Sequence, residues 1–182
     1  HISLPGSYQV ANAQTAIEVL RTMHVNENRI KEGISHTKWP GRMSKVAEKP
    51  YIYVDGAHNE AAWNALRETV ETYFTNRRVI YIIGVLKDKE YKKMVEILAP
   101  TMTYAIAITP DNPRGLSKEI LMELIRKTGV ECVTAKDREE ALSLARKQAG
   151  VEDVILVCGS LSFLAEYLHA PRTGKYIETD RR

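Results

Sequence analysis

The chain has 182 residues, with 26 Lys and Arg against 23 Asp and Glu, and a formal net charge of +3. Its length fits one ordinary domain, or one domain with a piece of another, and a domain of this size needs no disulfide or metal to fold. A composition of 44% hydrophobic and 27% charged residues excludes a disordered chain and a fibrous repeat. Because the first residue is His1 and not Met, we expect that the N-terminus was processed or that the chain was cut from a longer one.

Charge, apolar runs and cysteines narrow the class of protein further. The densest basic run, residues 87–93, is interrupted by Asp88 and Glu90, which predicts a solvated helix start and no nucleic-acid surface. No apolar run approaches the roughly 20 residues of a membrane span and no signal peptide is present, so we expect a cytoplasmic protein without a membrane partner. Cys132 and Cys158 lie apart in strand-like contexts and are expected to be buried free thiols, and no ligand spacing indicates a metal site.

The first region, residues 1–37, has helical character and no strand. Its apolar residues recur at helical spacing, which predicts a helix capped near Ser7. The residues of this stripe are Val10, Ala13, Ala16, Ile17 and Leu20. A polar stretch, a short helical turn and Gly33 follow. We interpret the region as the last helix of a preceding domain followed by a connector.

From residue 38 onward, strand-like runs alternate with helix-like runs. The strands are expected at 51–54, 79–83, 104–108, 131–134 and 154–158. Between them lie apolar helical stripes, one of which is stopped by Pro100, and a last helix begins with Phe163, Leu164 and Tyr167. Ser117 and Asp137 are expected to cap two of these helices, and Gly129 and Gly150 to follow their ends. This alternation predicts a Rossmann-like α/β domain at 38–182, with a mostly parallel sheet covered by helices on both faces.

Three of the strands end in polar, loop-forming sequence. Asp-Gly-Ala-His-Asn at 55–59 follows the first strand, Gly-Val-Leu-Lys-Asp-Lys at 84–89 the second, and Gly-Ser-Leu-Ser at 159–162 the fifth. The carboxyl ends of parallel strands share one edge of the sheet, where ligands bind. Each segment also opens a helix, whose N-terminus attracts anions. The sequence therefore predicts an anion-binding site at this edge.

Each of these residues also has a simpler structural interpretation. Asp55 suits a tight turn and Asn59 a helix cap, whereas His58 has no structural role that the sequence indicates. Lys89 suits a surface position, and Ser160 suits a helix cap.

Trp-Pro-Gly-Arg at 39–42 is a further distinctive segment. A rigid turn followed by Arg42 is suited to aim a guanidinium at a phosphate or a carboxylate. A turn before an edge strand is the alternative.

The segments at 39–42, 55–59, 84–89 and 159–161 occur in the order found in folylpolyglutamate synthases, the folate branch of the Mur ligase superfamily. Upstream, Gly6-Ser7-Tyr8-Gln9 and Asn12-Ala13 resemble the helix that closes the central ATPase domain of this family. The resemblance covers nearly the whole chain. It implies a Mur ligase C-terminal domain at 38–182 and, at 1–37, the terminal helix of the ATPase domain with a linker.

The resemblance implies an ATP-dependent, ADP-forming ligase of folate metabolism that adds L-glutamate to folate, and that also makes dihydrofolate in the bifunctional members. In this family ATP converts a folate carboxylate to an acyl phosphate, which the amine of glutamate attacks. ATP, Mg²⁺, folate, L-glutamate and the enzyme's own N-terminal ATPase domain are the implied cofactors and partners. We expect a cytoplasmic monomer.

Four residues would contact the nucleotide if they act as their counterparts in the family do. Asn12 would meet the adenine, and Arg42 would reach the phosphates from the other side of a cleft. Asp55 would hold the ribose or neighbouring groups, and His58 would lie near the γ-phosphate.

The same resemblance places the incoming glutamate at the other two strand ends. Lys89 and Lys87 would neutralise one of its carboxylates, and Ser160 with the helix N-terminus behind it would bind it as well. We name His58, Arg42 and Lys89 as the catalytic candidates, and no residue is singled out as a general base.

Two departures from the family pattern are small, and one absence is large. Ser162 stands where an aromatic residue is common, and Glu90 where Asp is common. The phosphate-binding loop GxxxxGK[ST] does not occur, since residues 173–176 lack both the upstream Gly and the hydroxyl residue. We therefore expect the magnesium ligands in a missing N-terminal region, and no ligation by the isolated chain.

Other interpretations stay open. The peptidoglycan branch of Mur ligases usually carries Tyr and Pro where this chain has Gly56 and Glu60. A stand-alone, non-catalytic Rossmann-like binding module is the alternative suggested by the absent phosphate loop. An NAD-binding module would need GxGxxG after the first strand, which residues 55–60 do not supply.

Overall fold

The computed structural model describes residues 1–160, 164, 167 and 168. The helices are α1 (Tyr8–Thr22), α2 (Glu27–His36), α3 (Glu60–Tyr73), α4 (Tyr91–Leu98), the 3₁₀ helix η1 (Ala99–Thr101), α5 (Lys118–Arg126) and α6 (Arg138–Gln148). The strands are β1 (Ser44–Glu48), β2 (Tyr51–Asp55), β3 (Val79–Ile83), β4 (Tyr104–Ala107), β5 (Cys132–Thr134) and β6 (Val154–Cys158). Among the described residues, no helix has the length and apolar character needed to cross a membrane.

The strands form one six-stranded sheet in the order β1-β2-β6-β3-β4-β5. All neighbours are parallel except β1, which runs antiparallel to β2. Strand β6 lies between β2 and β3, and its last residue, Cys158, pairs with both Asp55 and Ile83. The carboxyl ends of these three strands are therefore level, as the sequence predicts for a shared ligand edge.

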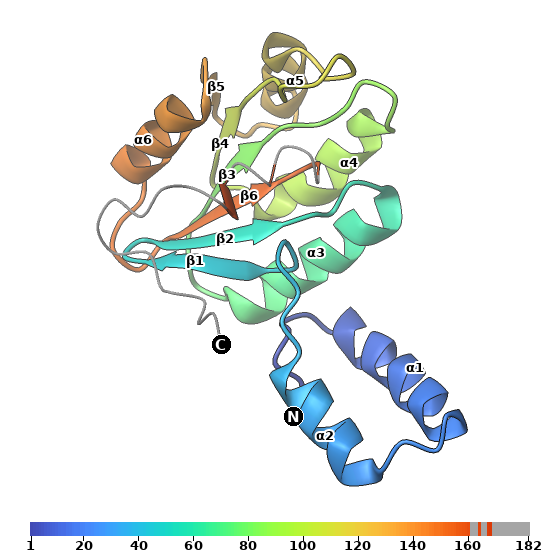
Figure 1. Cartoon of the computed structure of the whole chain (residues 1–182). Coiled ribbons are helices and arrows are strands. Elements are labelled where there is room, and N and C mark those ends of the chain that lie inside the picture. Colours follow the sequence, from blue (N-terminus) through green and yellow to red (C-terminus); the bar gives the residue numbers. More distant parts are fainter. Residues whose placement is uncertain (161–163, 165–166, 169–182) are drawn as a thin grey trace.

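Helices cover the two faces of the sheet unequally (Figure 1). Helices α3, α4 and α5 bury their apolar residues against one face, in a cluster that includes Trp63, Leu98 and Ile125. Helix α6 packs on the other face, where Leu164 and Tyr167 also lie. Because parallel strands connected by helices are covered on both sides, β3 and β6 are buried at every position.

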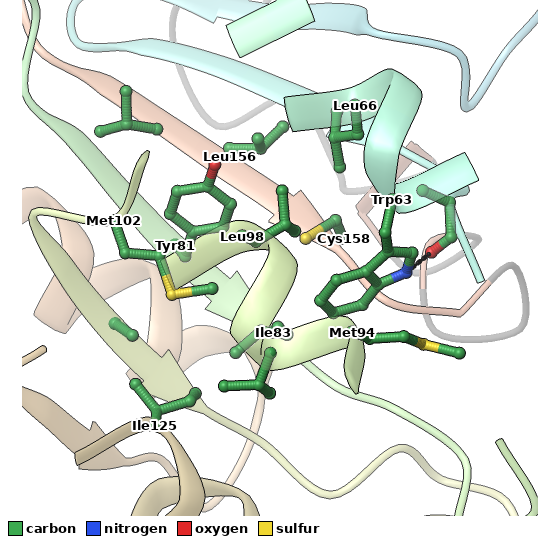
Figure 2. Packing of buried hydrophobic residues seen from close by; sticks show 14 of the residues in the cluster. Trp63, Leu66, Tyr81, Ile83, Met94, Leu98, Met102, Ile125, Leu156 and Cys158 are labelled. Carbon is green, nitrogen blue, oxygen red and sulfur yellow. Dashed lines mark hydrogen bonds between the residues drawn. The ribbon is translucent and has the colours of Figure 1, made fainter. Parts of the chain in front are cut away.

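Figure 2 shows the packing of the larger cluster. Trp63 and Leu66 of α3 and Met94 and Leu98 of α4 lie against Tyr81 and other residues of the sheet, and Trp63 and Tyr81 are fully buried. The hydroxyl groups of Tyr81 and Thr101 are hydrogen bonded at 2.6 Å, so the one polar atom of this ring is satisfied inside the core.

Helices α1 and α2 form a hairpin that lies beside the α/β layers (Figure 1). Only Gln9 and Ala13 are buried in α1, and only Ile30 in α2. The chain enters α1 at Gly6, where a Cβ would lie 2.6 Å from the Tyr8 ring and 3.1 Å from Thr69 Oγ1 of α3. The start of α1 is therefore packed against α3, whereas most of the hairpin is exposed.

The five predicted strands and the helices between them are confirmed, with end differences of one or two residues. Ser117 caps α5 by accepting from Glu119 N (3.2 Å), and Asp137 caps α6 by accepting from Glu140 N (2.9 Å). Helix α4 ends at Leu98 before Pro100. The predicted last helix is found at Leu164 and Tyr167, while Phe163 lies outside the described residues.

Two local predictions were wrong, and one was only an alternative. Ser7 precedes α1, but its side chain makes no capping hydrogen bond. The expected short turn is the ten-residue helix α2, which runs through Gly33 and is capped by Asn26. The edge strand β1 was expected only as the alternative interpretation of the 39–42 turn, because β1 itself contains little apolar sequence.

Candidate functional site

Asp55 joins two turns at the end of β2. Its side chain is 3% exposed, its Oδ2 accepts the N–H of Met43 and its Oδ1 accepts the N–H of Ala57, both at 2.9 Å. The N–H of Gly56 also donates to the carbonyl of Gly41 at 2.7 Å. Arg42, between Gly41 and Met43, is therefore held against the segment that carries His58.

Burial dominates the electrostatics of Asp55. It raises the pKa of this carboxyl above its usual value, and the two backbone N–H groups and the nearby Arg42 charge oppose the rise. Tyr8, at the start of α1, lies in the same electrostatic environment. Burial raises the pKa of Tyr8 to about 12, the Asp55 charge adds to the rise and the Arg42 charge opposes it. The beginning of α1 therefore lies beside the Asp55 and Arg42 pair.

His58 is half-buried and its ring is oriented locally. Its Nδ1 donates to the carbonyl of Gly56 at 2.8 Å, because a carbonyl can only accept. This bond leaves Nε2 as the ring nitrogen for a ligand. Asn59, next in the chain, caps α3 by accepting from Ala62 N at 2.9 Å, so its simpler interpretation is confirmed. Trp63 anchors the turn to the core by donating from Nε1 to the Ala57 carbonyl at 2.9 Å.

The turns after β3 and β6 touch through their backbones. Gly84 N donates to the Cys158 carbonyl at 3.2 Å, and Gly159 has a φ of +121°. A Cβ at Gly159 would lie 2.3 Å from the Gly84 carbonyl oxygen, closer than any side chain can approach. This contact fixes the lysine-bearing turn relative to Ser160, which is buried directly after Gly159.

Lys87 and Lys89 lie on a loop that is braced by the segment after β4. Lys87 N donates to the Arg114 carbonyl at 2.8 Å, and Leu116 N donates to the Val85 carbonyl at 2.9 Å. Asp88 and Arg114 form an ion pair at 3.1 Å. Lys87 is exposed and Lys89 half-buried. Arg114 was not among the predicted residues, although it lies in the turn-forming Asn-Pro-Arg-Gly run that the sequence shows.

Asn12 lies apart from the strand ends, on α1, but shares a cavity with Arg42. The cavity has a volume of about 380 Å³, within the usual range for small-molecule sites. It is lined by Ile2, Leu4, Gln9, Asn12, Ala13, Ala16, Ile34, Thr37, Trp39 and Arg42. Arg42 therefore belongs both to this cavity and, through its neighbours, to the Asp55 turns. The simpler interpretation of 39–42 as a turn before an edge strand is also correct, because β1 begins at Ser44.

In the part of the chain that the structure describes, no three His, Cys, Asp or Glu side chains gather to hold a metal ion. These residues do not supply a magnesium site, so Mg²⁺ enters no step derived below. Cys132 and Cys158 are buried free thiols, as the sequence predicts. Burial raises the pKa of Cys132 to about 12 and that of Cys158 well above its usual value.

The arrangement of this domain has known counterparts. Residues 41–161 match the family described as Mur ligase, glutamate ligase domain. The chain belongs to the Mur ligase family. This confirms the family resemblance and, together with the sheet order and its helical layers, the predicted fold class.

Curated relatives come from both branches of the family. The dihydrofolate synthase/folylpolyglutamate synthase of Bacillus subtilis is 31% identical over 90% of this chain, and that of Escherichia coli 33% identical over 90%. A UDP-N-acetylmuramoyl-L-alanyl-D-glutamate--2,6-diaminopimelate ligase of Caldanaerobacter subterraneus is 28% identical over 87%. The chain spans 39% of the first two relatives, about two fifths of their length.

Solved structures of related ligases have the same fold. A bifunctional folylpolyglutamate synthase/dihydrofolate synthase with Mn, AMPPNP and L-glutamate bound has a TM-score of 0.81 and 28% identity, over 93% of this chain and 41% of its own. The Mycobacterium tuberculosis folylpolyglutamate synthase complexed with ADP has a TM-score of 0.86 at 22% identity, over 94% of this chain and 42% of its own.

Proposed function

We propose that this chain is the C-terminal part of an ATP-dependent, ADP-forming ligase that adds L-glutamate to folate. Residues 38–182 are its glutamate ligase domain, and residues 1–37 are the terminal helix of its ATPase domain with a linker. One observation supports this most strongly. The level ends of β2, β6 and β3 bring the segments of His58, Ser160 and Lys89 to one edge of a Mur ligase domain.

Two substrates meet at this edge in the proposed reaction. A folate carboxylate takes the terminal phosphoryl group of ATP and becomes an acyl phosphate, with ADP released. The glutamate amine attacks the acyl carbon, loses a proton, and phosphate leaves as the amide bond forms. Activation is needed because a carboxylate is a poor acyl donor, and the gain depends on holding both reactants together.

The nucleotide side of the site uses Arg42 and His58. The guanidinium of Arg42 suits the phosphate oxygens as a charged donor with a fixed fork of N–H groups. His58, with its Nδ1 held by Gly56, presents Nε2 toward the transferred phosphoryl group. The cavity beside Asn12 has the size and the apolar lining that a base needs, which supports adenine binding there.

Asp55 acts here mainly through the turns that it joins. Both of its oxygens accept backbone N–H groups at 2.9 Å, which supports a role in holding Arg42 in place. A contact of Asp55 with the ribose remains a prediction.

The glutamate side uses Lys89, Lys87 and Ser160. Two ammonium groups on one loop favour a substrate with two carboxylates, because opposite charges attract most strongly where water is displaced. The Gly84–Gly159 contact holds this loop at a fixed position relative to Ser160. Folate, L-glutamate, ATP and the N-terminal ATPase domain are thus the proposed partners of a cytoplasmic monomer, with Mg²⁺ ligands outside these residues.

The test is ligation of L-glutamate by the full-length protein, followed by ADP release and by product mass. We expect Lys89→Ala to raise the KM for glutamate about tenfold or more through loss of a charged contact. We expect His58→Ala to lower kcat about a hundredfold through loss of a group at the transferred phosphoryl. Lys92→Ala, at an exposed lysine of α4, is the matched control and should change neither constant.

Three outcomes would contradict the proposal or a part of it. Ligation on UDP-muramyl precursors instead of folate would move the protein to the peptidoglycan branch. Absence of ATP-dependent ligation with either substrate would favour a non-catalytic binding module. Ligation by the isolated 182-residue chain would contradict the assignment of the phosphate loop and magnesium ligands to another region.

A further inference from the structure

Two amide side chains lie one turn apart on α1 and are joined to each other. Asn12 Nδ2 donates to Gln9 Oε1 at 3.0 Å. Gln9 is 5% exposed, although α1 is among the least buried elements of the protein, and Ala13 is the other buried residue of this helix. Both amides line the cavity that also contains Arg42. A buried glutamine in an otherwise exposed helix costs free energy unless it is hydrogen bonded, so its partner matters.

The hydrogen bond decides which way the Asn12 amide faces. An asparagine can rotate its amide by half a turn at little steric cost, exchanging a donor for an acceptor. A side-chain hydrogen bond with Gln9 lowers the pKa of Tyr8, so Gln9 turns its NH₂ group to that hydroxyl. Its Oε1, which can only accept, then keeps the NH₂ group of Asn12 on its own side. Oδ1 and the second N–H of Asn12 are then the polar atoms available to a ligand, and Asn12 itself is exposed.

This pair of atoms distinguishes the two purines. Adenine presents an N–H₂ donor beside a ring nitrogen acceptor, which an asparagine carbonyl and N–H match in a bidentate way. Guanine presents two acceptors at the same edge, O6 and N7, so an Asn12 oxygen facing it meets another oxygen. If the amide were free to rotate, its NH₂ group could turn to guanine O6 and make one hydrogen bond there, which would weaken the discrimination between the two bases.

The rest of the cavity suits a base attached to phosphates. Its apolar lining includes Ile2, Leu4 and Ile34, and its volume is about 380 Å³. Arg42 lies in the same lining and is held by the Asp55 turns. A flat apolar ring next to Asn12 and an anionic group next to Arg42 are the two ends of a nucleotide.

We propose that Gln9 is a positioning residue that gives the nucleotide site its preference for adenine over guanine, by fixing the orientation of the Asn12 amide. The inference rests on the proposed function, because it takes the cavity as the base-binding part of the ATP site. Gln9 acts through Asn12 and does not itself need to touch the base.

The experiment measures the ratio of kcat/KM for ATP to that for GTP in the full-length protein, together with ADP and GDP binding by calorimetry. Gln9→Met keeps the size of the side chain but cannot accept the Asn12 N–H, and it should lower the ratio about tenfold, the value of one hydrogen bond of moderate strength. Gln9→Glu retains an acceptor at Oε1 and should keep the ratio within about threefold of the original protein. Gln14→Met, at an exposed glutamine of the same helix, is the matched control and should leave the ratio unchanged.

A second variant tests whether Gln9 acts through Asn12, and it does so even if Gln9→Met lowers the stability of the protein. Asn12→Asp offers only acceptors in either orientation, so it should prefer adenine without help from Gln9. Adding Gln9→Met to Asn12→Asp should then leave the ATP to GTP ratio unchanged, although it lowers the ratio when Asn12 is present.

Several results would overturn the inference. Equal losses with ATP and GTP in Gln9→Met would show a purely structural role. A full-length protein that prefers ADP no more than GDP would show that no base selectivity exists. Absence of ligation with retained preference for ADP would contradict the proposed function and leave the role of Gln9 intact, so the two failures are distinguishable.

Discussion

The sheet region and the α1–α2 hairpin are built in opposite ways. Strands β3 and β6 are buried at every position, whereas α1 and α2 together bury only Gln9, Ala13 and Ile30. The sheet region holds the turns after its strands by backbone contacts close to the buried core. The hairpin supplies a few polar side chains from a helix that is mostly exposed.

The difference shows what each region can specify. Asp55, Gly84 and Gly159 leave little freedom for the turns after the strands, because N–H groups and carbonyls meet at close range. In the described part of the chain, Val10 and Val19 of α1 remain about half exposed. The positions of the turns are therefore fixed by the sheet. On the hairpin, the orientation of a side chain depends on single hydrogen bonds such as that between Gln9 and Asn12.

The largest effect expected from this comparison is that of Trp63→Ala. Trp63 is fully buried and donates to the Ala57 carbonyl, so its loss leaves a cavity and an unpaired carbonyl. We expect a loss of about 3–5 kcal/mol in the free energy of unfolding, measured by chemical denaturation. Val19→Ala on the exposed face of α1 is the matched control and should change stability by less than about 0.5 kcal/mol. Similar costs for both variants would show that the hairpin is packed as tightly as the sheet.

A pair of glycines should give changes of opposite sign. Gly159→Ala puts a Cβ against the Gly84 carbonyl at a φ of +121° and should cost about 2–3 kcal/mol in thermal or chemical unfolding. Gly33→Ala, inside α2 with no atom within 4 Å of the added Cβ, should stabilise the protein by about 0.5–1 kcal/mol. An unchanged stability of Gly159→Ala would contradict the close contact between Gly159 and Gly84.

Asp55→Asn tests the connection between the two turns. An asparagine has one acceptor oxygen for two backbone N–H groups, so we expect a loss of about 1–2 kcal/mol. Burial raises the Asp55 pKa, so the folded state binds this proton more tightly, and the contribution of Asp55 to stability falls as pH rises through that pKa. The cost of Asp55→Asn should therefore be larger at pH 4 than at pH 7. A larger cost at pH 7 would contradict this sign.

The smallest effect concerns the two thiols of the sheet. Burial raises the pKa of both Cys132 and Cys158, so neither should react with a thiol reagent at pH 8 until the protein unfolds. Because the unfolded thiols lose their protons first, stability should fall between pH 8 and pH 9 by roughly 0.5 kcal/mol for each thiol. Replacing one cysteine by Ala should remove half of this dependence. Rapid labelling of the folded protein would show that these strands open more readily than the burial suggests.

The sequence predicted much of the sheet region for a clear physical reason. Continuous apolar runs such as Val79–Ile83 cannot be satisfied except as buried strands, and the polar residues after them must lie at the strand ends. Caps such as Ser117 and Asp137 are local, so they could be predicted too. Strand β1 could be expected only from the turn before it, because its pairing with β2 depends on a distant partner and not on its own composition.

The residues of the candidate site could be predicted better than the contacts between them. His58, Lys89 and Ser160 follow strands and could be identified along the chain. Arg114 and Gln9 could not be identified in this way, since Arg114 is connected to the candidate site by an ion pair with Asp88 and Gln9 by a hydrogen bond to Asn12.

By itself, the amino-acid sequence determined the α/β class, the position of most strands and the residues that we propose for the chemistry, because these depend on local pattern and on short segments. Only the tertiary structure decided that Asp55 joins the Arg42 and His58 turns, that Gly84 and Gly159 touch, and that Asn12 and Arg42 share a cavity. These contacts join residues that are far apart in the chain, and they form only when the strands have paired in their final order.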